Sequence, residues 1–227
     1  MLLSILLSCA SENYARLYHT EAKAPSLTWE DIENFEHMGP VLVDRGVNFC
    51  TYSANAERIE ILLFDDPESE LPAQQYELMQ RGDLWCIYIE GVGIGQHYGY
   101  IAWGPNWTYD PEWLPGTTLG FRADVDNYGN RFNPNKLLFD PWGKAIHRDH
   151  DWFKGSVASG PSRAESTYAA GSKTVIVKSD YEWSEAETDW INLRTSENHP
   201  NHGWNELVFY EVHPKGFTMN PASGVDN

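Results

Sequence analysis

Basic residues are scarce in this sequence. The chain has 227 residues, with 16 Lys and Arg against 33 Asp and Glu, so its formal net charge is −17. Nucleic acids and anionic membrane surfaces are bound through basic faces, and the charge therefore argues against both as partners. The excess of carboxylates is typical of a solvated protein surface.

Cysteine is also rare, with three residues in the chain. Cys50 and Cys86 lie inside strand-like apolar runs, where an unpaired cysteine behaves as a small hydrophobic residue. Two cysteines do not make the disulfide framework of a small secreted domain. We therefore expect both thiols to be part of the core.

The apolar run that opens the chain, residues 1–10, is too short to span a bilayer. It lacks the Lys or Arg of a normal export signal. Its LLSC segment resembles a bacterial lipoprotein box, in which Cys9 would be acylated after cleavage. A truncated or wrongly started leader explains the same residues. The location therefore stays open. The protein is either secreted or anchored in the cell envelope through a lipid on Cys9, or it is cytoplasmic.

Aromatic residues are abundant, with 10 Trp, 12 Tyr and 9 Phe, and hydrophobic residues make up 41% of the chain. This apolar content excludes an intrinsically disordered protein. Flat rings can stack on the apolar face of a pyranose, but they fill a protein core equally well. Aromatic content alone therefore does not identify a sugar-binding protein.

Short apolar runs of strand character recur at intervals of about ten residues. Gly, Pro and Asp turn signals separate them, and no helical period interrupts residues 41–103. This pattern predicts an antiparallel β-sandwich. The expected strands lie in residues 41–52, 58–64, 75–79, 84–89 and 97–103, with later ones at 174–177 and 207–212.

Five segments, taken in chain order, share the pattern of one enzyme family. They are GVNF with YSANAERIE (46–60), YGYIAWGPNW (98–107), RFNPNKLLFDP (131–141), KTVIVKSDYEW (173–183) and YEVHPKGFT (210–218). They resemble isoamylases and glycogen-debranching enzymes of glycoside hydrolase family 13. That resemblance implies an immunoglobulin-like sandwich of the carbohydrate-binding module family 48 type, followed by a (β/α)8 barrel that hydrolyses α-1,6 branch points.

The resemblance implies a mainly β fold, an immunoglobulin-like antiparallel β-sandwich followed by irregular loops and the first strand of an incomplete (β/α)8 barrel. A leader and polar segment would cover 1–37, the sandwich 38–150, an irregular linker 151–203 and the start of the barrel 204–227. The family's catalytic acids lie on later barrel strands, so no catalytic residue is carried over. We expect this chain alone to be inactive.

The implied function is that of the N-terminal portion of an isoamylase-type enzyme hydrolysing α-1,6-glucosidic branches of glycogen or starch. Its partners would be an α-glucan (glycogen, amylopectin or maltodextrin) and the barrel in cis. The alternative is a stand-alone α-glucan-binding envelope lipoprotein. Such a binder has no use for residues 209–218, since a strand from the middle of a parallel barrel would leave an unpaired apolar edge.

Four aromatic residues cluster in a loop rich in Pro and Gly, namely Trp103, Trp107, Tyr109 and Trp113. Rings exposed on such a loop would form a stacking platform for an α-glucan. The same rings would serve equally well to pack against the barrel or to cover the sandwich. We take them as the candidate carbohydrate-binding residues.

The residues themselves point to no cofactor. The resemblance implies calcium in the intact enzyme, because some bacterial isoamylases bind it between sandwich and barrel through an acid that corresponds here to Asp149. Its other ligands would come from the barrel. The DVDNYG segment at 124–129 matches an EF-hand loop only in part, and a solvated turn accounts for it. The HRDHD run at 147–151 lacks the regular spacing of a zinc site.

Overall fold

The computed structural model describes residues 19–20, 37–153, 157–178, 180–186, 188 and 208–224. The chain divides into two compact units, Met1–Lys178 and Ser179–Asn227. Each unit is considered by itself. Among the described residues, no helix combines the length and the apolar character needed to span a bilayer.

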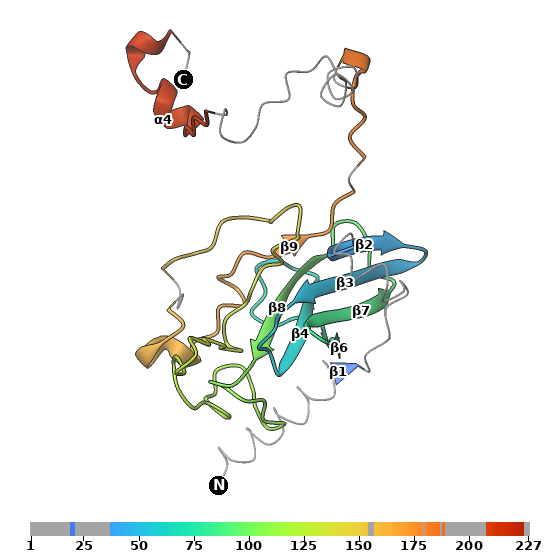
Figure 1. Ribbon diagram of the computed structural model, residues 1–227, viewed down its shortest axis with the longest axis vertical. Helices are drawn as coiled ribbons and strands as arrows, with labels where there is room; N and C mark the ends of the chain where they lie inside the picture. Colours follow the sequence, from blue (N-terminus) through green and yellow to red (C-terminus); the bar gives the residue numbers. More distant parts are fainter. Residues whose placement is uncertain are drawn as a thin grey trace. The chain divides into compact units, whose positions relative to one another are not determined.

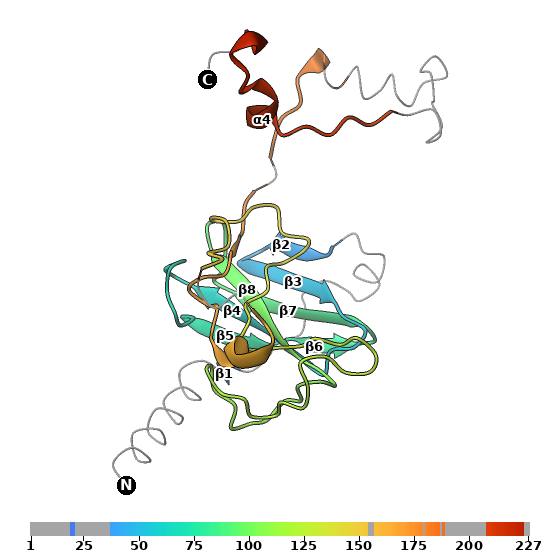
Figure 2. The ribbon, with the colours of Figure 1, turned by 90° about the vertical axis from the view of Figure 1, so that its left-hand side faces the viewer.

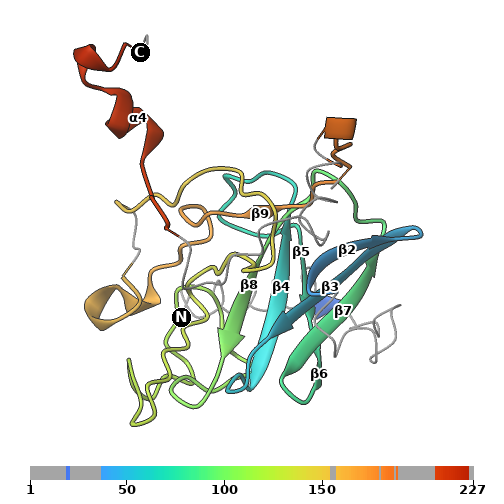
Figure 3. The same cartoon turned by 45° about the horizontal axis from the view of Figure 1, so that its top comes forward.

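The first unit is built on two β-sheets that face each other (Figures 1 and 3). The five-stranded sheet has the order β1 (His19–Thr20), β5 (Gln74–Glu77), β4 (Arg58–Phe64), β8 (His97–Trp103) and β9 (Thr174–Val175). The four-stranded sheet has the order β2 (Gly39–Val43), β3 (Gly46–Tyr52), β7 (Leu84–Glu90) and β6 (Met79–Arg81). Every described pairing except that of β1 with β5 is antiparallel. The mainly β sandwich expected from the sequence is confirmed.

Strand β4 shows why the five-stranded sheet is buried on both faces. Its side chains alternate, so Ile59, Ile61 and Leu63 join the core between the sheets, packed with residues of β3, β7 and β8. Leu62 and Phe64 point to the opposite face and belong to a second hydrophobic cluster. Ile101 and Trp103 of β8 also belong to that cluster. Its other members, Trp107, Trp113, Leu137 and Tyr168, come from the loops after β8, which run past β8 and β4 in Figure 2.

The two core cysteines form a disulfide, which corrects the expectation of unpaired thiols. Cys50 of β3 lies directly opposite Cys86 of β7, with their Cα atoms 4.2 Å apart. Both side chains are fully buried, in a third cluster with Met38 and Leu84. The sequence does not indicate this bond because 36 positions separate the cysteines. Only the register of the two strands brings them together.

Side chains of the RFNPNKLLFDP segment, residues 131–141, hold the covering loops in place through hydrogen bonds. Asn133 Nδ2 donates to two backbone carbonyl groups within residues 157–164, at 2.8 and 3.0 Å. Asn135 is fully buried and binds both a backbone N–H and a backbone C=O of residues 116–117, at 2.8 and 3.0 Å. These two side chains therefore join three loops over the outer face of the sheet.

Two charged residues of the same segment continue this buried network. Lys136 Nζ donates to two backbone carbonyl groups within residues 162–165, at 3.0 and 2.7 Å. Asp140 is 2% exposed and accepts hydrogen bonds from Tyr98 (2.8 Å) and Tyr100 (3.3 Å) on β8. Buried polar groups need such partners, which explains why the segment has this residue pattern.

The first unit continues past residue 150, where we expected the sandwich to end. Beyond that point come a short 3₁₀ helix, η1 (Gly160–Ala164), and strand β9. Tyr168 belongs to the second cluster and Ile176 to the core between the sheets. Much of the range assigned to an irregular linker therefore packs onto the sandwich, because the outer face of the sheet and its β8 edge need a cover.

In the second unit, the expected strand at residues 207–212 is wrong for the part that the structure describes. Residues 208–213 belong to no strand, and Val208 is 95% exposed. The helix α4 (Pro214–Thr218) follows, with His213 Nδ1 accepting from the N–H of Gly216 at 3.0 Å, and then η3 (Pro221–Ser223). Apolar character alone does not make a strand, since its backbone groups need a neighbouring strand as partner.

Candidate functional site

The expected aromatic platform is not exposed. Trp103, Trp107 and Trp113 are 1%, 1% and 6% exposed and form part of the second hydrophobic cluster. Trp103 and Trp113 meet edge to face, with ring centroids 5.1 Å apart. Tyr109 is half-buried, and the Arg58 guanidinium lies 4.0 Å from its ring centroid. The three tryptophans therefore cover the sandwich, which is one of the alternatives given above, and they do not form an exposed stacking platform.

Other aromatic residues are exposed around a pocket at the end of the signature segment. We call this site the aromatic pocket. Its volume is about 520 Å³, and Trp152 and Phe139 on it are 75% and 58% exposed. The lining residues are Leu137, Leu138, Phe139, Asp149, His150, Trp152 and Ser172.

The first wall of the aromatic pocket is held by the signature segment. Leu138 exchanges backbone hydrogen bonds with Tyr100 of β8, at 2.8 and 2.7 Å. Leu137 before it is 8% exposed and Asp140 is buried, so these two residues anchor the segment from inside. Leu138 and Phe139 between them are left facing outward, at 48% and 58% exposure.

The second wall, residues 149–152, is fastened at both sides. The N–H of Asp151 donates to the carbonyl of Ala170 at 2.9 Å. Arg148 donates to the carbonyls of residues 169 and 170, at 2.6 and 3.3 Å, and also to both carboxylate oxygens of Glu68, at 2.8 and 3.0 Å. These bonds give the pocket a preformed rim.

Polar groups stand beside the exposed rings. The Asp149 carboxylate is exposed, and Ser172 adds a hydroxyl. The His150 ring lies 4.7 Å from the Trp152 ring, and its Nε2 is buried without a hydrogen-bond partner among the described residues. Buried polar atoms are normally paired, so an unpaired imidazole nitrogen at a pocket is a candidate ligand contact.

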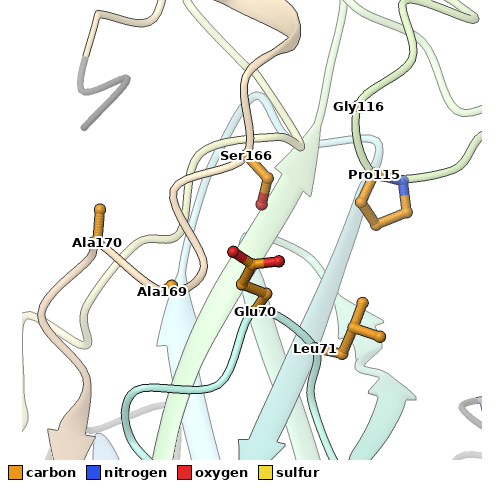
Figure 4. A pocket seen from close by; sticks show the side chains of 7 residues that line it. All are labelled: Glu70, Leu71, Pro115, Gly116, Ser166, Ala169 and Ala170. Atoms are coloured by element: carbon orange, nitrogen blue, oxygen red, sulfur yellow. The ribbon is translucent and has the colours of Figure 1, made fainter.

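A pocket of similar size offers a different chemistry (Figure 4). Its volume is about 400 Å³, and the Glu70 carboxylate and the Ser166 side chain point toward each other across it. The remaining lining residues are Leu71, Pro115, Gly116, Ala169 and Ala170. This pocket has no aromatic ring in its lining and thus no surface on which a sugar ring can stack. The aromatic pocket is therefore the better candidate site.

Sequence reasoning missed the aromatic pocket. Trp152 and Phe139 carry no spacing signal; Trp152 lies in the range that we assigned to an irregular linker, and Phe139 lies in the RFNPNKLLFDP segment. One indication was available in the sequence. Three consecutive apolar residues, Leu137 to Phe139, cannot all point inward if the segment runs extended along a sheet.

The described residues do not by themselves build a calcium site. Asp149 is exposed, and no group of three or more His, Cys, Asp or Glu suited to a metal occurs in the described part of the chain. The carboxylates of the DVDNYG segment are occupied, because Asp124 binds Arg163 and Asp126 accepts from the N–H groups of Tyr128 and Asn130. Calcium at Asp149 stays a prediction that needs ligands from another domain. Cys9 lies outside the described residues.

Acid should weaken the Asp124–Arg163 link between two covering loops. The hydrogen bond from Arg163 and then the N–H of Gly160 lower the pKa of Asp124 from 3.8 to about 2. Since the folded-state pKa is depressed, the stabilisation is present above pH 3.8 and is lost as the pH falls toward 2. In urea unfolding at pH values from about 6 down to about 2, the stability gap between wild type and Asp124→Asn should close as the pH falls.

Glu112→Gln is the matched control for that experiment. The Glu112 carboxylate is exposed and makes no ion pair within the described ranges. Its substitution should leave the pH profile parallel to that of the wild type. A gap between wild type and Asp124→Asn that stays constant down to the acid limit would contradict the proposed link.

Comparison with known proteins gives one family match and a set of longer relatives. Residues 37–143 match the family described as "Carbohydrate-binding module 48 (Isoamylase N-terminal domain)". The chain is 33% identical to an isoamylase of a Flavobacterium species, over 77% of this chain and 23% of that protein. It is also 33% identical to a glycogen debranching enzyme of Yersinia enterocolitica, over 77% of this chain and 22% of that protein. The chain thus spans about a quarter of the length of these relatives.

Among solved structures, the chain is similar to a pullulanase from Paenibacillus barengoltzii in complex with maltohexaose and α-cyclodextrin. The TM-score is 0.39 and the identity 14%, over 63% of this chain and 15% of that one. A pullulanase from Bacillus acidopullulyticus matches with a TM-score of 0.37 and 13% identity, over 62% and 12%.

Proposed function

Since this chain belongs to the isoamylase and glycogen-debranching family, whose N-terminal carbohydrate-binding module 48 its residues 37–143 match, we propose that its sandwich binds α-glucan at the aromatic pocket. The ligand class is glycogen, amylopectin or a maltodextrin. The proposed context is hydrolysis of α-1,6-glucosidic branches. That chemistry is assigned to the part of such enzymes beyond the region matched here.

The observation that carries this proposal is the exposed Trp152 ring beside Asp149, His150 and Ser172. A glucose unit presents an apolar face and a rim of hydroxyl groups. Sugar recognition therefore needs a flat ring for the face and a few fixed polar groups for the rim. The aromatic pocket combines both, and its walls are held by hydrogen bonds before any ligand arrives.

The charge of the chain also favours a neutral ligand. At a net charge of −17, the protein repels anions at long range, whereas an uncharged glucan meets no such barrier. Acidic groups at the pocket accept hydrogen bonds from sugar hydroxyls. The net charge therefore agrees with a polysaccharide and disfavours a phosphorylated metabolite.

Replacing the exposed tryptophan should remove most of the affinity. We expect Trp152→Ala to bind glycogen about tenfold or more weakly, as estimated from the loss of one stacked aromatic contact and its hydrophobic area. The measurement is affinity electrophoresis of the full chain in gels containing glycogen or amylopectin. Because Trp152 is 75% exposed, the variant should fold normally.

Tyr128→Ala provides the control, since Tyr128 is 92% exposed and lines none of the described pockets. It should be retarded as strongly as the wild type. Wild-type protein that migrates equally in gels with and without glucan would overturn the proposal. So would a Trp152→Ala variant that is retarded as strongly as the wild type.

A second proposal for the same surface is docking against the catalytic barrel in cis. Phe153, which follows Trp152 in the chain, is fully exposed and adds apolar surface. If docking is the function, the wild-type chain fails the glucan test and Trp152 becomes shielded from solvent when the barrel is present. The stand-alone lipoprotein has no support in the relatives, which are named as enzymes. Calcium at Asp149 and an envelope location through Cys9 are still proposals.

A further inference from the structure

A second pocket adjoins the aromatic pocket. We call it the arginine pocket, and its volume is about 390 Å³. The lining residues are Ala102, Gly129, Asn130, Arg131, Phe132, Asn133, Lys136, Leu138 and Ala158. Leu138 also lines the aromatic pocket. The two pockets therefore meet at this residue of the signature segment.

Resting on the proposed function, we infer that the two pockets form one extended site for several consecutive units of a linear α-1,4-glucan. One part of the chain lies against Trp152 in the aromatic pocket. The next units cross the exposed side of Leu138 and enter the arginine pocket. Binding then depends on the length of the glucan, which a single-sugar site does not require.

The arginine pocket has the groups that a sugar needs. Phe132, Ala102 and Leu138 give an apolar wall, and Arg131 is exposed at its edge. A guanidinium presents five N–H donors in a planar fork, which suits the adjacent hydroxyl groups of a pyranose. The neighbouring Asn130 adds an amide, whose Nδ2 is oriented by Asp126 at 2.8 Å.

The walls of the arginine pocket are preformed. Asn133 Nδ2 binds the carbonyl of Ala158 at 2.8 Å and so joins two parts of the lining. Lys136 Nζ donates to two backbone carbonyl groups, which holds this lining side chain in place. Leu138 is held in place by its backbone pairing with Tyr100. A rigid site loses less entropy on binding, which favours recognition of a flexible oligosaccharide.

The test is calorimetric titration of the full chain with maltotriose and with maltohexaose. Wild-type protein should bind maltohexaose more tightly than maltotriose. Arg131→Ala should weaken maltohexaose binding by roughly tenfold, the loss expected for hydrogen bonds to a charged group. It should leave maltotriose binding unchanged, because the short ligand is held at Trp152. Arg122→Ala is the control, since Arg122 is exposed and lines neither pocket, and it should match the wild type with both ligands.

The outcomes separate this inference from the proposed function. Equal affinity of the wild type for both ligands, or an Arg131→Ala variant that binds maltohexaose as the wild type does, overturns the extended site. If Trp152→Ala still loses binding in that case, the proposed function stands. Wild-type protein that binds neither oligosaccharide overturns both.

Discussion

Loss of the Cys50–Cys86 disulfide should lower the free energy of unfolding by about 4 kcal/mol, on the chain-entropy estimate for a loop of this size. The bond closes a loop between residues 36 positions apart, which restricts the unfolded chain. Both cysteines are fully buried, so a reductant reaches the bond only when the chain unfolds. Urea unfolding of the oxidised and the reduced protein, with reduction carried out on the unfolded chain, measures the difference.

The double variant Cys50→Ala and Cys86→Ala separates the disulfide from other effects of the reductant. Its stability should be close to or below that of the reduced wild type, because it also lacks two buried sulfur atoms. Addition of reductant should not change it. Cys9 remains in both proteins, so any effect of the reductant on this thiol is the same in the two. Identical unfolding midpoints for oxidised and reduced wild type would show that the bond contributes nothing.

Asp140→Ala should destabilise the first unit by about 3 kcal/mol, the scale expected when several buried donors lose their acceptor. In the native protein, this carboxylate accepts from the hydroxyl groups of Tyr98 and Tyr100 and from the N–H of Trp142. Alanine removes this acceptor from two buried tyrosine hydroxyl groups and from the half-buried N–H of Trp142. Thermal and urea unfolding measure the loss, and a cost similar to that of an exposed Asp→Ala substitution would refute the role assigned to Asp140.

Asp140→Asn keeps the shape and one acceptor oxygen, so it should be less damaging than alanine. Burial raises the pKa of Asp140 above its ordinary value of 3.8. Because the folded-state pKa is the higher one, the native protein loses stability as the pH rises above 3.8 through that pKa. The asparagine variant has no such titration. The stability of Asp140→Asn relative to the wild type should therefore improve as the pH rises from 3.8 through the folded-state pKa, and level off above it.

Local patterns predicted the strands of the sandwich well. Residues 58–64, 84–89 and 97–103 were expected as strands and are found as β4, β7 and β8 within one residue at each end. The expected strand at 41–52 is two strands, β2 and β3, joined by a tight turn. Arg45 in this turn has a φ of 62°, a left-handed conformation that Gly or Asn usually occupies, so the sequence gives little sign of it.

The candidate site was far less predictable than the strands. Trp107 and Trp152 both lie in loops, yet one is 1% exposed and the other 75%. No spacing or turn signal distinguishes them. The difference arises because Trp107 packs against the outer face of the five-stranded sheet, whereas Trp152 stays largely uncovered by the described part of the chain.

By itself, the sequence determined the β-sandwich, its family and the place of the signature segment, because alternation, turn residues and motifs are properties of neighbouring positions. Only the tertiary structure decided that Cys50 meets Cys86, that Trp103, Trp107 and Trp113 are buried, and that Trp152 is exposed. Each of these depends on contacts between distant segments. Lys173 Nζ, for example, donates to the carbonyl of Pro67 across 106 positions. Such contacts follow from strand register and loop packing, which no local pattern contains.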